Sequence, residues 1–386
     1  MHFAFTEEQT LIHDTARAFC AEHGATSRLR AAIESPPGYD EVSWHAIGEE
    51  LGWCGIALPA DVGGSGLGSV ELAILCEQMG RVLLPSPFFA TVALAAPAIA
   101  LAATAAQREA LLPGIAAGRT RATLAVANEH GAPGLDGIGP RLTRSKHGWR
   151  LGGTAGFVIH ADVADVLVVA ARVTGSRGTD GVSLVVVRPD DASVSIERLT
   201  MLDQTRPMSR VRFKSLALAP GAILGEPGEA GPALATALAR AQAALAAEQL
   251  GGAEAALEIT TEHAKTRIQF DRPIGSFQAV KHRLADMMVA IEAARSAAYY
   301  AACAVDELPE EFEEAAAVAG SWCSETFTGC AADMIQLLGG VGFTWEHVAH
   351  LYFKRARASS TLLGSPAWHR ERIAARLLPV TTGQSA

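Results

Sequence analysis

The sequence lacks the features that mark secreted, membrane-spanning or nucleic-acid-binding proteins. Its six cysteines form no CxxC pair, so neither a disulfide framework nor a cysteine metal site is indicated. With 32 Lys+Arg against 41 Asp+Glu, the formal net charge is 32 − 41 = −9, and no polybasic run occurs. This balance argues against nucleic acid as a partner.

Long leucine-rich runs and a basic leader are also missing. The most apolar stretch, residues 90–106, is rich in alanine and contains Pro97, which predicts a buried helix rather than a membrane span. Residues 1–8 have neither the basic start nor the apolar core of a signal peptide. We therefore expect a cytoplasmic protein with no membrane partner.

The sequence contains three segments with different hydrophobic periods. The chain has 386 residues, of which 49% are hydrophobic, so it can bury more than one core. Helical periodicity up to residue 119 predicts an N-terminal α-helical domain, residues 1–119. Short β-branched runs predict a middle antiparallel β-barrel or sandwich, residues 120–225. Helical periodicity then returns and predicts a C-terminal four-helix bundle, residues 226–386.

The bundle is predicted from four helix-length stretches. Thr6, followed by two glutamates, has the form of an N-cap for the first helix of the N-terminal domain. The candidate bundle helices are residues 233–266, 277–305, 310–338 and 348–378.

Two motifs in the bundle carry a family resemblance. Residues 267–278 read R-I-Q-F-D-R-P-I-G-S-F-Q and continue to L-A-D-M at 284–287. Residues 336–343 read Q-L-L-G-G-V-G-F. Together they resemble the acyl-CoA dehydrogenase signatures R-x-x-F-G-x-P-I-x-x-F-Q and Q-x-x-G-G-x-G-[FY]. The resemblance implies the acyl-CoA dehydrogenase fold and FAD as cofactor.

The chemistry of these motifs suits the ADP half of FAD. A diphosphate favours a guanidinium such as that of Arg267 and backbone donors that glycines leave accessible. The resemblance implies that these positions hold the ADP half of an FAD bound mainly by the neighbouring subunit. The predicted cofactor-binding residues are Arg267, Phe270, Phe277, Gln278, Gln336, Gly339 and Gly340.

The catalytic base of the family is missing at both of its known positions. Many members carry it in an E-G-T segment near the C-terminus, and counting without gaps places Leu363 there. Others carry it on the first bundle helix, where Ala241 stands here. Glu248 lies two turns further along that helix, about 10 Å away along its axis. We therefore expect Glu248 to be structural, and the catalytic residue remains unknown.

The segments that face the flavin ring in the family also differ. The counterpart of L-N-G-x-K-x-W-I-T-N is residues 151–160, where Phe157 replaces the tryptophan and Ile159 replaces a threonine. An isoleucine side chain cannot form the hydrogen bond that threonine gives to the flavin. Near residues 127–130 only Glu129 remains of the T-E-P-G-x-G-S-D loop. The ring-side positions have therefore changed, whereas the ADP-side positions are retained.

This pattern resembles the base-lacking subunit of actinobacterial-type α2β2 acyl-CoA dehydrogenases that act on steroid side-chain acyl-CoA. The resemblance implies an oxidoreductase acting on CH–CH bonds, in which this chain is a non-catalytic subunit that completes its partner's FAD site. It further implies an acyl-CoA substrate, a tetramer with an acyl-CoA dehydrogenase-like subunit, and an electron-transfer flavoprotein or similar acceptor. Two alternatives stay open: a homotetrameric dehydrogenase with a displaced base, and a flavin oxidase or monooxygenase.

A pair of histidines, His347 and His350, lacks a third ligand, so no metal is expected.

Overall fold

The computed structural model describes residues 5–378, so residues 1–4 of the stretch tested above for a signal peptide, and residues 379–386 of the last predicted segment, lie outside the described residues. The N-terminal segment is helical, and Thr6 caps its first helix in a reciprocal capping box with Gln9. Its helices are α1 (Glu7–His23), α2 (Thr26–Glu34), α3 (Glu41–His45), α4 (Ser69–Arg81), α5 (Ala96–Ala102) and α6 (Ala105–Ala116). Short helical turns lie between them: η1 (Ala46–Glu50), η2 (Trp53–Gly55), η3 (Ala60–Val62) and η4 (Phe89–Ala95).

The first part of the apolar stretch, residues 90–100, is largely buried, as its composition predicts, whereas residues 101–106 are exposed or half-buried. It forms η4 and α5, and Pro97 stands in the first turn of α5, where a missing N–H has no cost. Among the described residues, the longest helices are too polar for any of them to cross a lipid bilayer.

The middle segment folds into one sheet of eight strands. These are β1 (Ala122–Ala125), β2 (Arg141–Ser145), β3 (Gly148–Ile159), β4 (Val166–Val173), β5 (Val182–Val187), β6 (Val194–Arg198), β7 (Met208–Ala217) and β8 (Ile223–Leu224). The order is β6-β7-β3-β2-β4-β5-β8, with β1 paired to β4. Most pairs are antiparallel, as in the predicted barrel or sandwich, but β1–β4 and β2–β4 are parallel, which was not predicted.

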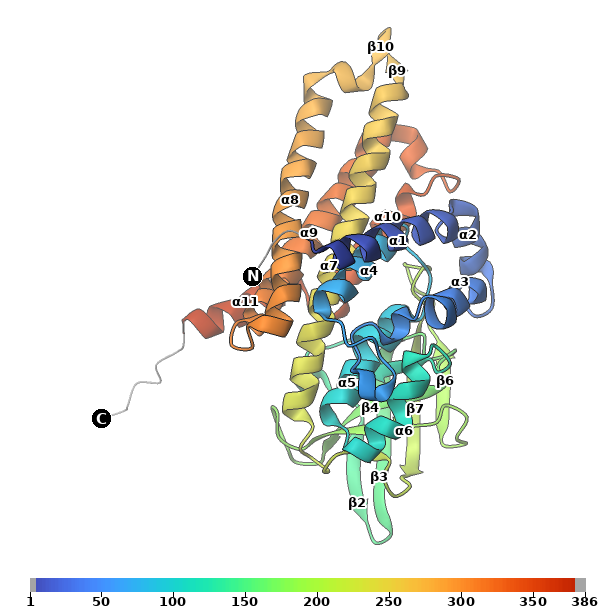
Figure 1. The fold of residues 1–386 in the computed structure, drawn as a ribbon, viewed down its shortest axis with the longest axis vertical. Helices are drawn as coiled ribbons and strands as arrows, with labels where there is room; N and C mark the ends of the chain where they lie inside the picture. Colours follow the sequence, from blue (N-terminus) through green and yellow to red (C-terminus); the bar gives the residue numbers. More distant parts are fainter. Residues whose placement is uncertain (1–4, 379–386) are drawn as a thin grey trace, which may run out of the picture.

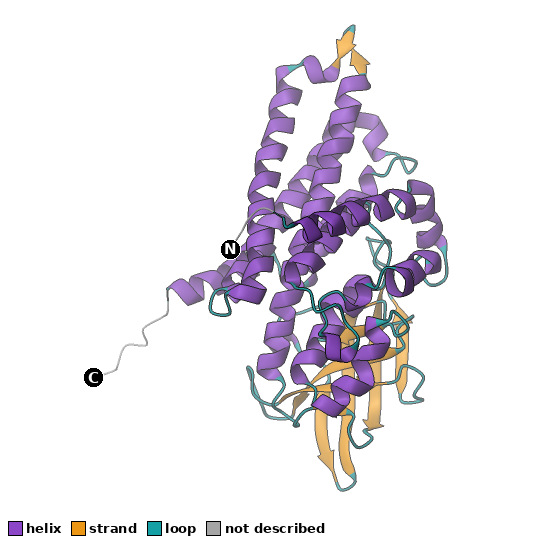
Figure 2. Cartoon of the chain, in the orientation of Figure 1, coloured by secondary structure: helices purple, strands orange, loops and turns teal. Residues whose placement is uncertain are grey.

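The C-terminal segment is a bundle of long helices. It contains α7 (Gly231–Thr266), α8 (Gln278–Glu307), α9 (Phe312–Leu338), α10 (Ala349–Leu362) and α11 (Pro366–Leu377). A small hairpin of β9 (Ile268–Gln269) and β10 (Arg272–Pro273) joins α7 to α8 through η6 (Ile274–Ser276). Figure 1 shows this hairpin at the end of the bundle opposite the sheet, and Figure 2 shows the strands gathered at the other end.

The fourth bundle helix is broken, whereas the sequence prediction had it continuous over residues 348–378. Gly364 adopts φ +119°, a conformation that only glycine takes readily. Ser365 then caps a new helix, and Pro366 occupies its first position. The break places Leu363 in a loop between α10 and α11.

The order of a helical segment, a sheet and a helical bundle confirms the predicted fold class. One hydrophobic core lies within the sheet, one within the bundle, and a third joins the N-terminal helices to α7. The division at residues 119/120 and 225/226 remains a prediction.

Candidate functional site

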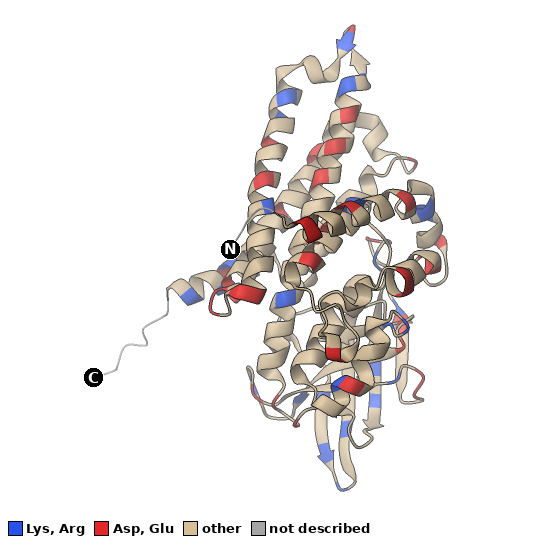
Figure 3. Cartoon of the chain, in the orientation of Figure 1, with Lys and Arg blue, Asp and Glu red and all other residues tan. Residues whose placement is uncertain are grey.

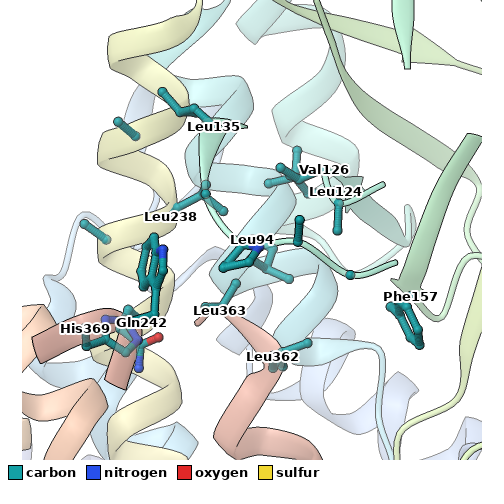
Figure 4. A pocket seen from close by; sticks show the side chains of 18 of the residues that line it. Leu94, Leu124, Val126, Leu135, Phe157, Leu238, Gln242, Leu362, Leu363 and His369 are labelled. Carbon is teal, nitrogen blue, oxygen red and sulfur yellow. The ribbon is translucent and has the colours of Figure 1, made fainter. Parts of the chain in front are cut away.

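A cavity of about 230 Å³ lies where the three segments meet. β1, β3, η4, α7, α9 and the α10–α11 loop all contribute to its wall. Most of the wall is aliphatic, with Leu94, Leu124, Leu238, Leu362 and Leu363 among its residues. Figure 4 shows these side chains between the ribbon of α7 and the strands that carry Phe157.

An irregularity in β3 places Phe157 at the cavity. The register between β3 and β7 shifts between Ala155 and Val158, and Phe157 has φ 53°. Such a bulge redirects one side chain away from the regular alternation of the strand. The Phe157 ring lies against Gly131, where an added Cβ would be 3.1 Å from it. Ile159 also lines the cavity and is almost fully buried.

The break between α10 and α11 closes another side of the cavity. Leu363 lines the wall, so the structure brings the predicted base position to this cavity. The Trp368 indole packs against both Gly134 and Gly364. A Cβ added at Gly134 would lie 3.1 Å from the ring, and one added at Gly364 would lie 2.3 Å from it. The Arg372 guanidinium stacks over the Trp368 ring, 4.8 Å from its centroid.

Among the described residues, the wall of this cavity contains no aspartate or glutamate. Its buried polar side chains are Gln242 on α7 and His369 on α11. Burial first, and then the nearby Arg372 charge, lower the pKa of His369 to about 4, so the imidazole is neutral at pH 7. Neither residue was predicted from the sequence to be part of a site.

The other predicted base position lies away from the cavity. Ala241 is fully buried in the core that joins α7 to the N-terminal helices, and it does not line the cavity. Its neighbours Leu238, Ala239 and Gln242 occupy the wall instead. None of these positions carries a carboxylate.

Glu248 is held in a buried ionic cluster outside this cavity. Its carboxylate pairs with Arg206 and lies 2.9 Å from Nη1 of Arg355. Arg355 Nε also lies 2.9 Å from Oδ2 of Asp203. Glu248 therefore has two guanidinium partners and a structural position, which agrees with the expectation from sequence.

The predicted cofactor-binding residues gather at the hairpin end of the bundle. Arg267 ends α7, Gln278 begins α8, and Gln336 lies in the last turn of α9. In the described part of the chain, the side chains of these three residues make no hydrogen bond or ion pair with one another or with other residues. Gly339 and Gly340 border open space, since an added Cβ at either would meet no atom within 4 Å.

Two phenylalanines of the predicted set also lie at this end. The rings of Phe270 and Phe277 meet edge to face at 6.1 Å, and the Arg272 guanidinium lies 4.1 Å from the Phe277 centroid. Phe270 is 86% exposed. From residue 265 to 283 there are five Lys or Arg and one acidic residue, Asp271. Figure 3 shows these basic positions near the hairpin.

The two ends are far apart in one chain. From Gln242 in the cavity wall to Arg267 there are 25 residues of helix, which is about 38 Å along the axis. From Ala317 to Gln336 along α9 there are 19, or about 28 Å. One small ligand therefore cannot contact both ends of the same chain.

The histidine pair noted in the sequence has other partners. His347 Nδ1 accepts from the backbone N–H of Ala349 at 3.1 Å, and His350 stacks on Trp345 at 4.6 Å. Across residues 5–378 no group of three or more His, Cys, Asp or Glu side chains is arranged to hold a metal ion.

Comparison with known proteins gives one consistent family. The profile of "Acyl-CoA dehydrogenase, N-terminal domain" matches residues 6–119, and that of "Acyl-CoA dehydrogenase, C-terminal domain" matches residues 231–378. The acyl-CoA dehydrogenase IpdE2 of Mycobacterium tuberculosis is 35% identical over 360 residues, covering 93% of this chain and 94% of that protein.

Two solved structures are similar over nearly the whole chain. A variant of the Tcur3481–Tcur3483 steroid ACAD has a TM-score of 0.85 and 34% identity, covering 96% of this chain and 98% of that chain. The ChsE4–ChsE5 complex from Mycobacterium tuberculosis has a TM-score of 0.88 and 26% identity, covering 98% of this chain and 100% of that chain.

Proposed function

Because this chain belongs to the acyl-CoA dehydrogenase family, we propose that it is a subunit of an FAD-dependent enzyme that oxidises acyl-CoA thioesters between the α and β carbons. In this reaction FAD supplies the hydride acceptor, and a carboxylate takes the α-proton. In our proposal this chain holds the ADP half of a neighbouring subunit's FAD and does not supply the carboxylate.

One observation supports this division of labour above all others. The cavity in which the family carries its base has Leu363, Leu238, Ala239 and Gln242 on the wall, and none of these can accept the α-proton as a carboxylate does. Arg267, Gln278 and Gln336, whose side chains have no partner among the described residues, lie at the opposite end of the bundle. A chain built in this way can complete a site in trans, but it lacks a complete site of its own.

The residues at the hairpin end fit the ADP half of FAD. A diphosphate carries negative charge, and the segment around Arg267 has an excess of four positive charges, five Lys or Arg less one Asp. Gly339 and Gly340 leave backbone groups open to a ligand, and Gln336 and Gln278 offer exposed amides. The ring-side cavity fits less well, because Ile159 offers no side-chain hydrogen bond to the flavin.

Exposed aromatic groups support assembly at the same end. Phe270, Phe343 and Trp345 are 86%, 85% and 56% exposed, and large apolar side chains gathered in this way are typical of interfaces. The similar ChsE4–ChsE5 structure is itself a complex of two different chains. We propose an α2β2 tetramer, an acyl-CoA substrate with a steroid-like acyl group, and an electron-transfer flavoprotein or similar carrier as electron acceptor.

The test is the FAD content of the chain alone and after co-expression with a candidate catalytic partner. We expect a colourless chain alone and about one FAD per heterodimer in the complex.

Arg267→Gln should weaken FAD binding by the complex by about 10- to 100-fold, since a charge-assisted hydrogen bond contributes about 1.5–3 kcal/mol. Absorbance at the flavin band, after dialysis against graded FAD concentrations, measures both quantities.

Arg177→Gln is the matched control, because Arg177 is an exposed arginine in the loop between β4 and β5, and Figure 1 shows the sheet at the end opposite the hairpin. It should leave the FAD content unchanged. One FAD per chain in the protein alone, bleached by an acyl-CoA, would instead establish a self-sufficient dehydrogenase with a displaced base. Bound flavin that turns over with O2 alone would establish an oxidase or monooxygenase.

A further inference from the structure

We propose that the cavity of this chain binds a neutral, mainly apolar ligand that carries a hydroxyl group, and that Gln242 and His369 hold this group. The inference goes beyond the FAD-sharing role and does not depend on it. It rests on two buried polar side chains whose hydrogen-bonding groups have no partner and which face a largely aliphatic space.

Both side chains are buried and incompletely bonded. Gln242 is 4% exposed and His369 is 1% exposed. Within residues 5–378, no group forms a hydrogen bond with Gln242 Oε1 or with either ring nitrogen of His369. The backbone of Gly364 also raises the pKa of His369, although no hydrogen bond between the two meets the usual distance and angle limits. Buried polar groups in proteins are almost always satisfied, so the pair indicates a partner that enters the cavity.

The chemistry of the pair selects the partner. His369 is neutral at pH 7, so one ring nitrogen donates and the other accepts, whichever tautomer is present. Gln242 Oε1 can only accept. A hydroxyl group both donates and accepts, so it can donate to Gln242 Oε1 and accept from the imidazole N–H. Figure 4 shows the two side chains next to each other on the α7 side of the cavity.

The rest of the wall determines the body of the ligand. Leu94, Leu238, Leu362 and Leu363 present only hydrocarbon to the space. A charged ligand would have to be desolvated beside a neutral imidazole, which is unfavourable. The Arg372 charge sits over the face of Trp368, where the aromatic ring already stabilises it. The ligand class is therefore an uncharged ring or branched hydrocarbon with one hydroxyl group.

Three fluorescent probes with the same naphthalene ring system test this directly on the purified protein. 2-Naphthol donates and accepts, 2-methoxynaphthalene only accepts, and 2-methylnaphthalene does neither. We expect 2-naphthol to bind about tenfold more tightly than 2-methylnaphthalene, because a well-placed hydrogen bond in a buried site gives a preference of this size. 2-Methoxynaphthalene should bind with intermediate affinity. Fluorescence titration gives all three dissociation constants without any variant.

Two substitutions then identify the groups responsible. Gln242→Leu and His369→Phe keep the apolar volume but remove the polar atoms, so each should reduce the preference for 2-naphthol to about twofold or less. Binding of 2-methylnaphthalene should stay within about threefold of wild type. His147→Phe is the control, because His147 is an exposed histidine in the β2–β3 turn; it should keep the full preference.

The outcomes are decisive in both directions. Equal affinity of the folded wild type for 2-naphthol and 2-methylnaphthalene would overturn the proposal, since water alone would then satisfy the pair. A preference that survives in both folded variants would also overturn it. Loss of the preference in the two variants, with the control unchanged, would establish the site.

Discussion

At the scale of single residues, Glu77 on α4 is an unusual carboxyl. It is 3% exposed, and Oη of Tyr299 donates a hydrogen bond to it at 2.8 Å. Burial first, and then repulsion from Glu254, raise the pKa of Glu77 from 4.5 to about 7. The folded protein therefore holds a proton here over a pH range in which the unfolded chain has lost it.

The raised pKa of Glu77 makes the stability of the folded protein depend on pH. Between pH 4.5 and 7 the folded state binds more protons at Glu77 than the unfolded state, so this group's stabilising contribution falls as the pH rises through that window. Glu77→Gln keeps an acceptor for Tyr299 but removes the charge. We expect the variant to match wild type at pH 5 and to be more stable at pH 8, by up to about 2 kcal/mol. Urea unfolding at both pH values measures this.

A second substitution controls for the cluster as a whole. Glu254 pairs with Arg81 at 2.7 Å and with Arg295, so Glu254→Gln leaves two arginines with fewer partners. It should destabilise the protein at both pH values. A Glu77→Gln variant that is less stable than wild type at pH 8 would contradict the argument.

Residue-level prediction from sequence depends on the exact rotation of a helix. Ala241 was selected by counting along α7, but the wall of the cavity is formed by Ala239 and Gln242. Neighbouring residues on an α-helix point about 100° apart, so an error of one or two positions turns a wall residue into a core residue. Leu363 lines the cavity, although it was selected only by counting from Gly339 and Gly340, while the helix was predicted to continue through this position.

At the scale of elements, the β9–β10 hairpin is strained at its tip. Its two central residues, Phe270 and Asp271, have φ 52° and 63°. This is the two-residue turn that asparagine and glycine favour, and a large aromatic residue there is costly. An isolated chain gains nothing evident from an 86% exposed Phe270, which indicates that the residue serves an interface.

Phe270→Asn separates these two effects. The substitution should stabilise the isolated chain by about 0.5–1 kcal/mol, because asparagine adopts positive φ more readily. It should weaken assembly with the partner, since a large apolar contact is lost. Thermal unfolding of the chain and analytical ultracentrifugation of the mixture measure the two effects.

Leu202→Asn is the control for this experiment, because Leu202 is a 60% exposed apolar residue in the sheet domain. It should leave assembly unchanged. If Phe270→Asn assembled as well as wild type, the proposed interface at the hairpin end would be wrong.

Elements differ in how far the sequence predicts them. Helices α7, α8 and α9 begin and end within about two residues of the prediction, because uninterrupted helical periodicity is a strong local signal. The parallel pairing of β1 and β2 with β4 was not predictable. Pairing between distant strands depends on the chain path, and no local residue pattern records it.

At the scale of the whole molecule, the sequence predicts the order of the segments but not their junction. The cavity, with Phe157 from the sheet, Leu94 from η4 and Gln242 from α7, exists only where the three segments meet. Its polar pair could not be found from sequence, because one glutamine of an alanine-rich helix and one distant histidine have no recognisable spacing. The separation of the hairpin end from the cavity follows once the helices are placed.

A buried ionic cluster, formed by Glu248, Arg355, Arg206 and Asp203, holds this junction together. Glu248 is on α7 and Arg355 is on α10, whereas Asp203 and Arg206 come from the segment between β6 and β7. Arg206 also lies 4.9 Å from the ring centroid of Phe89 on η4. The cluster thus ties the sheet to the bundle and to the N-terminal helices, with two positive and two negative groups in balance.

Glu248→Ala should uncouple these parts. It leaves two buried guanidinium groups with one carboxylate, and removing one partner of a buried ion pair costs about 3–5 kcal/mol. Because the lost contacts join segments rather than lie within one, we expect the wild type to unfold in one calorimetric transition and the variant in two. Glu258→Ala is the control: its carboxylate pairs with Arg81 while 60% exposed, so its loss should cost at most about 1 kcal/mol. A single sharp transition in Glu248→Ala, shifted no more than in the control, would show that the apolar cores alone hold the three segments together.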